Sequence, residues 1–168
     1  MSWEGEVMKV PGKGKVAVLG ALMLGAGSAW GEVHEVEVRN QGSDGQRMVF
    51  EPALVEAAPG DTVRFVFEDM GHNAAAYHPD NRGKPSLVPE GAAAWDSGFK
   101  KPGDAFEVTL DTEGAHHYFC LPHEGMAMVG LIAVGDAGQG PGLDAVEDSG
   151  IPDAAKAKLR KLHEELDG

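Results

Sequence analysis

The sequence brings together side chains that bind soft metal ions. They are His72, Cys120, His123 and Met128, with His three residues and Met eight residues after the single Cys. Thiolate and thioether sulfur favour copper(I), and imidazole binds both copper(I) and copper(II). Two His, one Cys and a weak axial Met form the trigonal site of blue copper electron carriers. The donor set therefore predicts a type 1 copper site with one copper per chain.

A zinc site is the main alternative for a Cys and His donor set. Structural zinc sites use four strong ligands, and the thioether of Met128 is not one of them. Cys120 is the only cysteine, so no internal disulfide can form. A free thiol in an oxidising compartment is a liability unless a metal occupies it. Each residue alone is weak support for a metal, and the interpretation depends on the whole set.

The other histidines have no comparable spacing. They are His34, His78, His116, His117 and His163. We interpret them as structural or surface groups, with His78 the one most worth checking because it lies six residues after His72.

Hydrophobic periodicity predicts a set of short strands. The expected strands are residues 33–38, 48–50, 53–55, 62–67, 106–110, 116–120 and 129–134. Several of them alternate apolar and polar residues, and Gly- and Pro-containing turns separate them. The 24 Gly and 10 Pro of the 168 residues agree with a turn-rich chain. The pattern predicts an all-β fold, a sandwich or barrel.

Two segments depart from this strand pattern. Residues 72–98 form a connection too long for a hairpin loop, which we expect to wrap the sandwich and to carry a short strand or helical turn. Residues 153–166 predict a helix, because Leu159, Leu162 and Leu166 share one face. We expect this stripe to pack against the sandwich rather than to bind a partner.

The N-terminus has the order of a secretory signal peptide. Basic residues precede an apolar run at 16–26, and small residues follow it. The apolar run is too short to span a membrane, so we expect no membrane insertion. Cleavage after Ala29 or after Gly31 fits the sequence, and acidic residues before Met8 suggest that Met8 is the true start. Residues 1–31 are thus the predicted signal peptide, and the periplasm is the expected location.

The net charge of −13 limits the classes of partner. A strongly acidic chain is unsuited to nucleic acid or to an anionic membrane surface. It permits a basic docking surface on a protein partner, and it equally fits a role in solubility.

The motifs resemble the plastocyanin/azurin superfamily of cupredoxins, and within it they are most similar to the pseudoazurins. The resemblance covers residues 33–168. The matching elements are Cys120-x-x-His123-x-x-x-x-Met128, Gly71-His72-Asn73, residues 88–92, the strand at 129–135 and the helical tail. The resemblance implies a Greek-key β-sandwich, here residues 32–136, and a C-terminal helical extension at 137–168.

The resemblance also implies a function. Such proteins are monomeric one-electron carriers of the periplasm and not enzymes, and their partners are redox proteins such as cytochrome c or a copper or haem reductase. Cys120 would be the strong ligand and the source of the blue colour, His72 and His123 would complete the trigonal plane, and Met128 would be a long axial contact. One edge of His123 is expected at the surface in an apolar patch, where electrons leave.

Residues beside the ligands are expected to affect the reduction potential of the copper. The backbone N–H of Asn73 is expected to bond the Cys120 sulfur, as in relatives. Pro122 has no N–H to give. We therefore expect one amide bond to the sulfur, which favours Cu(II) and lowers the reduction potential.

Several features depart from the family pattern. Leu121 stands where Ser or Thr is common, so the usual hydroxyl partner of the Asn73 side chain is missing. Residues Tyr77–Pro85 look like an insertion that could reshape the rim near His72 or His78. Glu124 is expected to place a negative charge beside the electron exit, where it selects a basic partner or is simply solvated.

Two other functions remain open from the sequence. A copper storage or delivery protein would use the same ligands but would release copper readily. A fragment of a multicopper oxidase or nitrite reductase would need a second copper centre, and this chain supplies no second ligand set.

Overall fold

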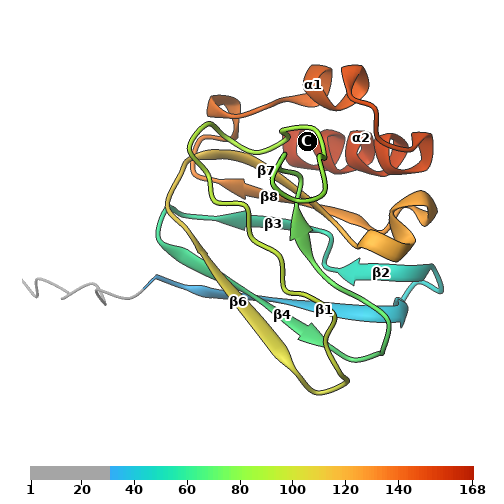
Figure 1. The fold of residues 1–168 in the computed structure, drawn as a ribbon. Helices are drawn as coiled ribbons and strands as arrows, with labels where there is room; N and C mark the ends of the chain where they lie inside the picture. Colours follow the sequence, from blue (N-terminus) through green and yellow to red (C-terminus); the bar gives the residue numbers. More distant parts are fainter. Residues whose placement is uncertain (1–30) are drawn as a thin grey trace, which may run out of the picture.

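Two four-stranded sheets face each other in the computed structural model, which describes residues 31–168 (Figure 1). The predicted signal segment therefore lies outside the described residues, apart from Gly31. The all-β sandwich expected from the strand periodicity is confirmed, and so is the C-terminal helix expected from the leucine stripe.

The first sheet has the order β2-β1-β4-β6. Its strands are β1 (Val33–Gln41), β2 (Arg47–Glu51), β4 (Asp61–Phe67) and β6 (Ala105–Leu110). β1 pairs parallel with β4, and the other two pairings are antiparallel. Burial alternates strictly along β4, where Val63, Phe65 and Phe67 are fully buried. One face of this sheet therefore packs on the core and the other meets solvent.

The second sheet has the order β3-β8-β7-β5. Its strands are β3 (Leu54–Ala57), β5 (Ala75–Ala76), β7 (Gly114–Phe119) and β8 (Val129–Val134). Every residue of β7 and β8 is buried. Both faces of this sheet are covered, on one side by the first sheet and on the other by the C-terminal helices (Figure 1).

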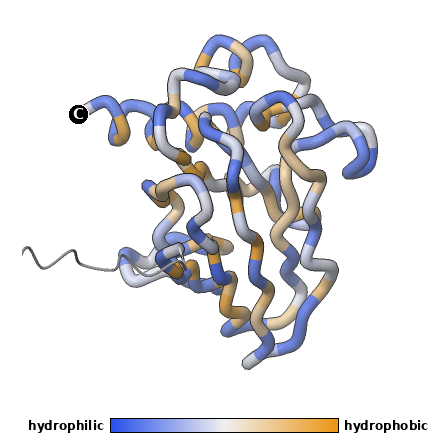
Figure 2. Tube along the Cα trace, turned by 90° about the vertical axis from the view of Figure 1, so that its left-hand side faces the viewer, coloured by the Kyte–Doolittle hydropathy of each residue, from blue (hydrophilic) through white to orange (hydrophobic). Residues whose placement is uncertain are grey.

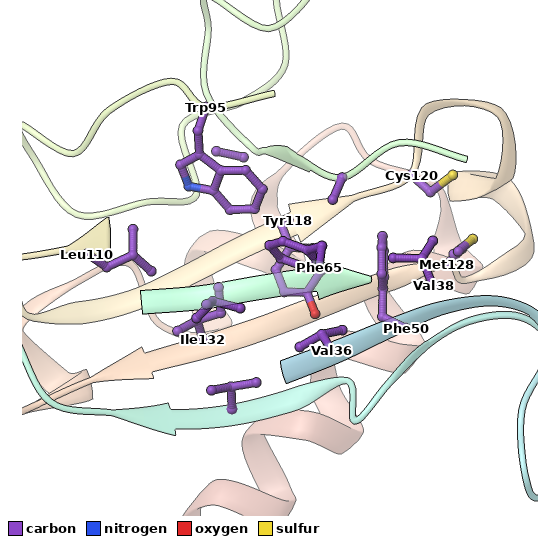
Figure 3. Close-up of a cluster of buried hydrophobic side chains, with 14 of the residues drawn as sticks. Val36, Val38, Phe50, Phe65, Trp95, Leu110, Tyr118, Cys120, Met128 and Ile132 are labelled. Carbon is purple, nitrogen blue, oxygen red and sulfur yellow. The ribbon is translucent and has the colours of Figure 1, made fainter. Parts of the chain in front are cut away.

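Aromatic rings fill the space between the sheets. Phe50, Phe65, Trp95 and Tyr118 belong to one cluster, with ring centroids of Phe50 and Tyr118 4.7 Å apart and those of Phe65 and Tyr118 5.2 Å apart (Figure 3). Gly130 of β8 faces Tyr118 so closely that an added Cβ would lie 2.2 Å from the ring. Position 130 therefore requires a glycine. The aromatic cluster holds the two sheets together next to the end of β7.

The C-terminal extension packs on the second sheet. It comprises η2 (Ala137–Gln139), α1 (Leu143–Asp148) and α2 (Asp153–Asp167). Ala155, Leu159 and Leu162 of α2 are buried in a second apolar cluster with β8 residues such as Leu131. The predicted helix is confirmed, and so is its packing against the sandwich. α1 was not predicted, because six residues carry too little periodicity.

Two connections between strands are important for the site, one between β4 and β6 and one between β7 and β8. Residues 72–98 contain β5 as their one short strand, as expected, and run along one side of the sandwich (Figure 1). The β7–β8 loop forms a 3₁₀ turn, η1 (Leu121–Met126), which was not predicted.

Figure 2 shows hydrophobic and hydrophilic residues alternating along several strands. Among the described helices, none is both long and apolar enough to cross a membrane.

Candidate metal centre

Three side chains from separate elements converge at one end of the sandwich. His72 follows β4, Cys120 directly follows β7, and His123 lies in η1. The Cys120 Sγ lies 3.7 Å from His72 Nδ1 and 3.5 Å from His123 Nδ1. All three ligand atoms lie within 4.8 Å of one another. The structure thus brings together residues 48 positions apart in the sequence, as the motif predicted.

These separations suit a single bound ion. Donor atoms held about 2.0 to 2.3 Å from one ion, as in protein zinc sites, lie roughly 3.5 to 3.8 Å from each other. One soft thiolate and two imidazoles fit copper by ligand type. The residues present therefore fit the metal that the sequence predicts.

Met128, the fourth predicted donor, lies immediately before β8. Its side chain is fully buried. Figure 3 shows the sulfur atoms of Cys120 and Met128 at the same end of the core cluster. The N–H of Met128 donates to the His123 carbonyl at 3.1 Å, and the N–H of Cys120 donates to the Met128 carbonyl at 3.0 Å. These two backbone hydrogen bonds link Cys120, His123 and Met128 within one closed loop.

The imidazole of His72 is held with Nδ1 toward the sulfur. Its Nε2 lies 2.8 Å from Oδ1 of Asn40, so the ring donates its Nε2–H to the amide oxygen and leaves Nδ1 free as a ligand. Burial, the larger effect, and the neighbouring His123 lower the pKa of His72. Burial also lowers the pKa of His123. Both rings are therefore neutral at pH 7, the form that binds metal.

Asn40 is a site residue that the sequence did not reveal. It lies near the end of β1, 32 residues before His72, and no motif or spacing connects the two.

Asn73 has a partner despite the missing hydroxyl at position 121. Its Oδ1 accepts the backbone N–H of Leu121 at 2.7 Å, and its Nδ2 donates to Asp96 at 3.1 Å. The backbone N–H of Leu121 therefore takes the place of the missing hydroxyl as a partner of Asn73. Asn73 ties the segment of His72 to the loop that follows Cys120.

Two opposing effects act on the Cys120 thiol. Burial raises its pKa to about 11, and the backbone amides of Asn73 and His123 oppose this rise by smaller amounts. The His123 N–H donates to the Cys120 carbonyl oxygen at 3.2 Å. The expectation of a single amide bond to the sulfur stays a prediction.

Exposed apolar side chains lie close in sequence to the two histidines. Met70 precedes His72 by two residues, Met126 lies in η1 with His123, and both are at least half exposed. Phe99 is also exposed, and the N–H of the next residue donates to the His72 carbonyl at 3.4 Å. His123 itself is partly exposed. The site therefore has a buried sulfur and a histidine that reaches the surface.

Glu124 does not lie at the surface as expected. It is 6% exposed, forms an ion pair with Lys84 and accepts a hydrogen bond from the Tyr77 hydroxyl at 2.7 Å. Both sequence interpretations, a steering charge and a solvated charge, were wrong. The residues that bury this carboxylate belong to the Tyr77–Pro85 segment.

A second cluster of potential ligands contains Glu32, His34 and Asp61. Asp61 already accepts three hydrogen bonds, from the N–H groups of Glu32 and Ala58 and from His34 Nε2, each at 2.8 Å. These bonds, with that of His34 the largest, lower the pKa of Asp61. Both oxygens of the carboxylate are engaged and join the starts of β1 and β4, so we assign Asp61 a structural role.

The remaining histidines lie away from the convergent group. His116 donates to the Thr112 carbonyl, and His117 bonds both the Leu87 carbonyl and His163 of α2. His78 is partly exposed and its Nδ1 accepts the N–H of Asp80. None is part of the described metal-ligand clusters, in agreement with the structural role expected for them.

The chain matches a family model and several curated relatives. Residues 36–135 match the copper-binding proteins of the plastocyanin/azurin family. The chain is 35% identical over 146 residues to a putative pseudoazurin of Rhizobium leguminosarum bv. viciae, covering 87% of this chain and 88% of that protein. It is 36% identical over 143 residues to a pseudoazurin of Paracoccus pantotrophus, covering 85% and 90% respectively.

A solved structure shares the fold. The structure of a pseudoazurin from Sinorhizobium superposes with a TM-score of 0.68 at 38% identity, covering 82% of this chain and 98% of that chain. The family match includes the segment that carries His72, Cys120, His123 and Met128. The chain therefore belongs to the plastocyanin/azurin family of copper-binding proteins, and it is a type 1 copper protein that carries single electrons.

Proposed function

We propose that His72, Cys120, His123 and Met128 hold the one copper of this chain. The observation that carries the proposal is the convergence of one thiol sulfur and two Nδ1 atoms within 4.8 Å. The fixed ring orientation of His72 and the burial of Met128 support it. When bound, copper supplies a one-electron Cu(I)/Cu(II) couple.

The protein residues keep the ligands in place while the charge changes. The rigid sandwich and the hydrogen bonds of Asn40 and Asn73 hold the two ligand segments. Burial of Cys120 and Met128 excludes water from the sulfur atoms. Small movement of the ligands between oxidation states permits fast electron transfer.

Electrons enter and leave through the partly exposed edge of His123. The exposed Met70, Phe99 and Met126 provide an apolar surface on which a redox protein docks. Such a small apolar contact suits a transient complex. The partner class is a redox protein, such as a cytochrome c or a copper or haem reductase, and the chain itself is a monomer without catalytic activity of its own.

The chain acts in the periplasm after removal of residues 1–31. The order of basic, apolar and small residues in that segment supports export. We divide the mature chain into a copper-binding domain at residues 32–136 and a helical extension at residues 137–168 that packs on it.

Spectroscopy and voltammetry of copper-loaded protein test the proposal. We expect intense visible absorption from the copper–thiolate bond and a reversible one-electron wave. Replacement of the thiol by Cys120→Ser should abolish the colour. A colourless loaded protein would overturn the ligand assignment, and a coloured protein without a reversible wave would favour copper storage or delivery.

A further inference from the structure

The ligand loop contains a buried carboxylate that is not a ligand. Glu124 lies in η1 between His123 and Met128 and is 6% exposed. Its Oε1 accepts the Tyr77 hydroxyl at 2.7 Å, and its Oε2 pairs with the ammonium of Lys84. Burial, followed by the contact with Glu124, raises the pKa of Tyr77, so the phenol remains a hydrogen-bond donor. Both carboxylate oxygens are therefore engaged by groups outside the loop.

The groups that hold Glu124 are themselves fixed to β7. The Tyr77 N–H donates to the His117 carbonyl, and the Tyr77 carbonyl accepts from Leu87, both at 3.0 Å. The Tyr77 ring lies 4.6 Å from that of Phe119 between centroids. The Lys84 ammonium lies 4.9 Å from the centroid of the same Phe119 ring. The two partners of Glu124 thus rest on the strand that leads directly to Cys120.

Hydrogen bonds of the Asn81 side chain hold the segment that carries both partners in place. The Asn81 side chain donates to the carbonyls of Ala76 and Trp95, at 2.8 and 3.1 Å. These contacts involve no metal ligand. The segment therefore offers a rigid surface against which η1 can be held whether or not copper is bound.

We propose that Tyr77, Lys84 and Glu124 form a loop clamp, a set of positioning residues that fixes the His123 and Met128 segment to the Tyr77–Pro85 insertion and balances the charge beside the copper. The inference rests on the proposed ligand set. It assigns a role to the insertion and to the one buried acidic side chain of η1.

The charge balance makes the loop clamp distinguishable from simple packing. Lys84 and Glu124 together are neutral, and either one alone leaves a charge in a poorly hydrated position near the copper. A positive charge there stabilises Cu(I), and a negative charge stabilises Cu(II). Glu124→Gln should therefore raise the reduction potential, and Lys84→Met should lower it.

Voltammetry of the wild-type protein and four variants provides the first test. The double variant Glu124→Gln with Lys84→Met should lie between the two single variants, because both charges are then absent. The matched control is the exposed pair of Arg64 and Glu107 on the first sheet, where Glu107→Gln should leave the potential unchanged. Shifts of the same sign in both single variants, or no shift in either, would overturn the charge role of the loop clamp.

Hydrogen exchange of copper-free protein provides the second test and does not depend on copper. The amides of Ala127 and Met128 donate to the carbonyls of Glu124 and His123. Tyr77→Phe removes only one hydroxyl, and we expect it to speed exchange of these amides about tenfold, the effect of losing a hydrogen bond to a charged group. Unchanged exchange would contradict the positioning role, and failure of the wild-type protein to bind copper would contradict only the proposed ligand set.

Discussion

Single residues outside the ligand set determine how the ligands are presented. The spacing of Cys120, His123 and Met128 made the metal chemistry predictable from sequence, because one short loop carries all three. Asn40 was not predictable, because its contact with His72 arises only when the end of β1 meets the segment after β4. The burial of Glu124 was unpredictable for the same reason, since Tyr77 and Lys84 are 47 and 40 residues away.

Removal of the His72 partner tests the importance of that hydrogen bond. Asn40→Leu leaves Nε2–H of His72 without its acceptor and frees the ring to rotate. Loss of such an outer partner lowers metal affinity by about 10- to 100-fold, and we expect the lower end because Asn40 is itself exposed. Competition with a copper chelator measures the change. Gln41→Leu, on the neighbouring exposed position, is the control, and equal affinity in both variants would count against the role of Asn40.

Whole elements were predictable where their periodicity was long enough. The alternating burial of β4 and the leucine stripe of α2 have clear sequence patterns, and both elements lie where expected. η1 and α1 were missed, because each spans only six residues, too few to show an amphipathic repeat, and neither has a side-chain N-cap that the sequence could signal. The two-residue β5 is defined by its pairing with β7 and by the bridge from Ala75 to Asp96, and two residues carry no sequence pattern of their own.

The docking of α2 is tested by truncation of its central leucine. Leu159 is fully buried between α2 and the second sheet. Leu159→Ala should lower the free energy of unfolding by about 2 to 5 kcal/mol, the usual cost of a cavity at a buried leucine. Denaturant unfolding of the copper-free protein measures it. Lys161→Ala on the exposed face of α2 should change the free energy little, and a similar small effect at Leu159 would mean that the extension is only loosely attached.

The contact between β7 and α2 should be sensitive to acid. Burial, the main cause, lowers the pKa of His117 to about 3, and burial lowers the pKa of His163 although Asp167 opposes it. The ring nitrogens of the two residues lie 2.8 Å apart, which requires that one of them accepts. In the unfolded chain a histidine takes up its proton near pH 6.5. Between that pH and about 3 the unfolded state binds more protons, so stability falls as the pH falls.

Denaturant unfolding of copper-free protein at pH 7.5 and at pH 5 measures this acid dependence. Each such group contributes up to about 1.4 kcal/mol per pH unit in the window. His117→Gln keeps a donor for the Leu87 carbonyl but does not titrate, so its stability should change less between the two pH values. An unchanged pH dependence in that variant would place the acid sensitivity elsewhere.

At the scale of the whole molecule, net charge and local charge differ. The chain has a net charge of −13, yet the cavities beside Met126 and Ala127 are lined by Arg47, Lys158 and Lys161. Composition could not reveal this, because it depends on where α2 packs relative to η1. The acidic steering charge expected at Glu124 is neutralised by burial and pairing. The surface next to His123, the proposed electron exit, is therefore basic on this side.

Charge reversal at Lys158 tests whether this local charge guides electron transfer. Lys158→Glu should slow oxidation of the reduced protein by the hexacyanoferrate(III) anion and should speed oxidation by a cationic cobalt(III) complex, because the reactant meets the opposite local potential. Both differences should shrink as salt is added, since screening acts over about 10 Å at 0.1 M. Arg64→Glu changes the net charge equally but lies on the first sheet, paired with Glu107. Equal effects of the two substitutions would mean that the net charge of the protein controls the approach of the reactant. The local positive charge of Arg47, Lys158 and Lys161 beside Met126 would then have no separate role.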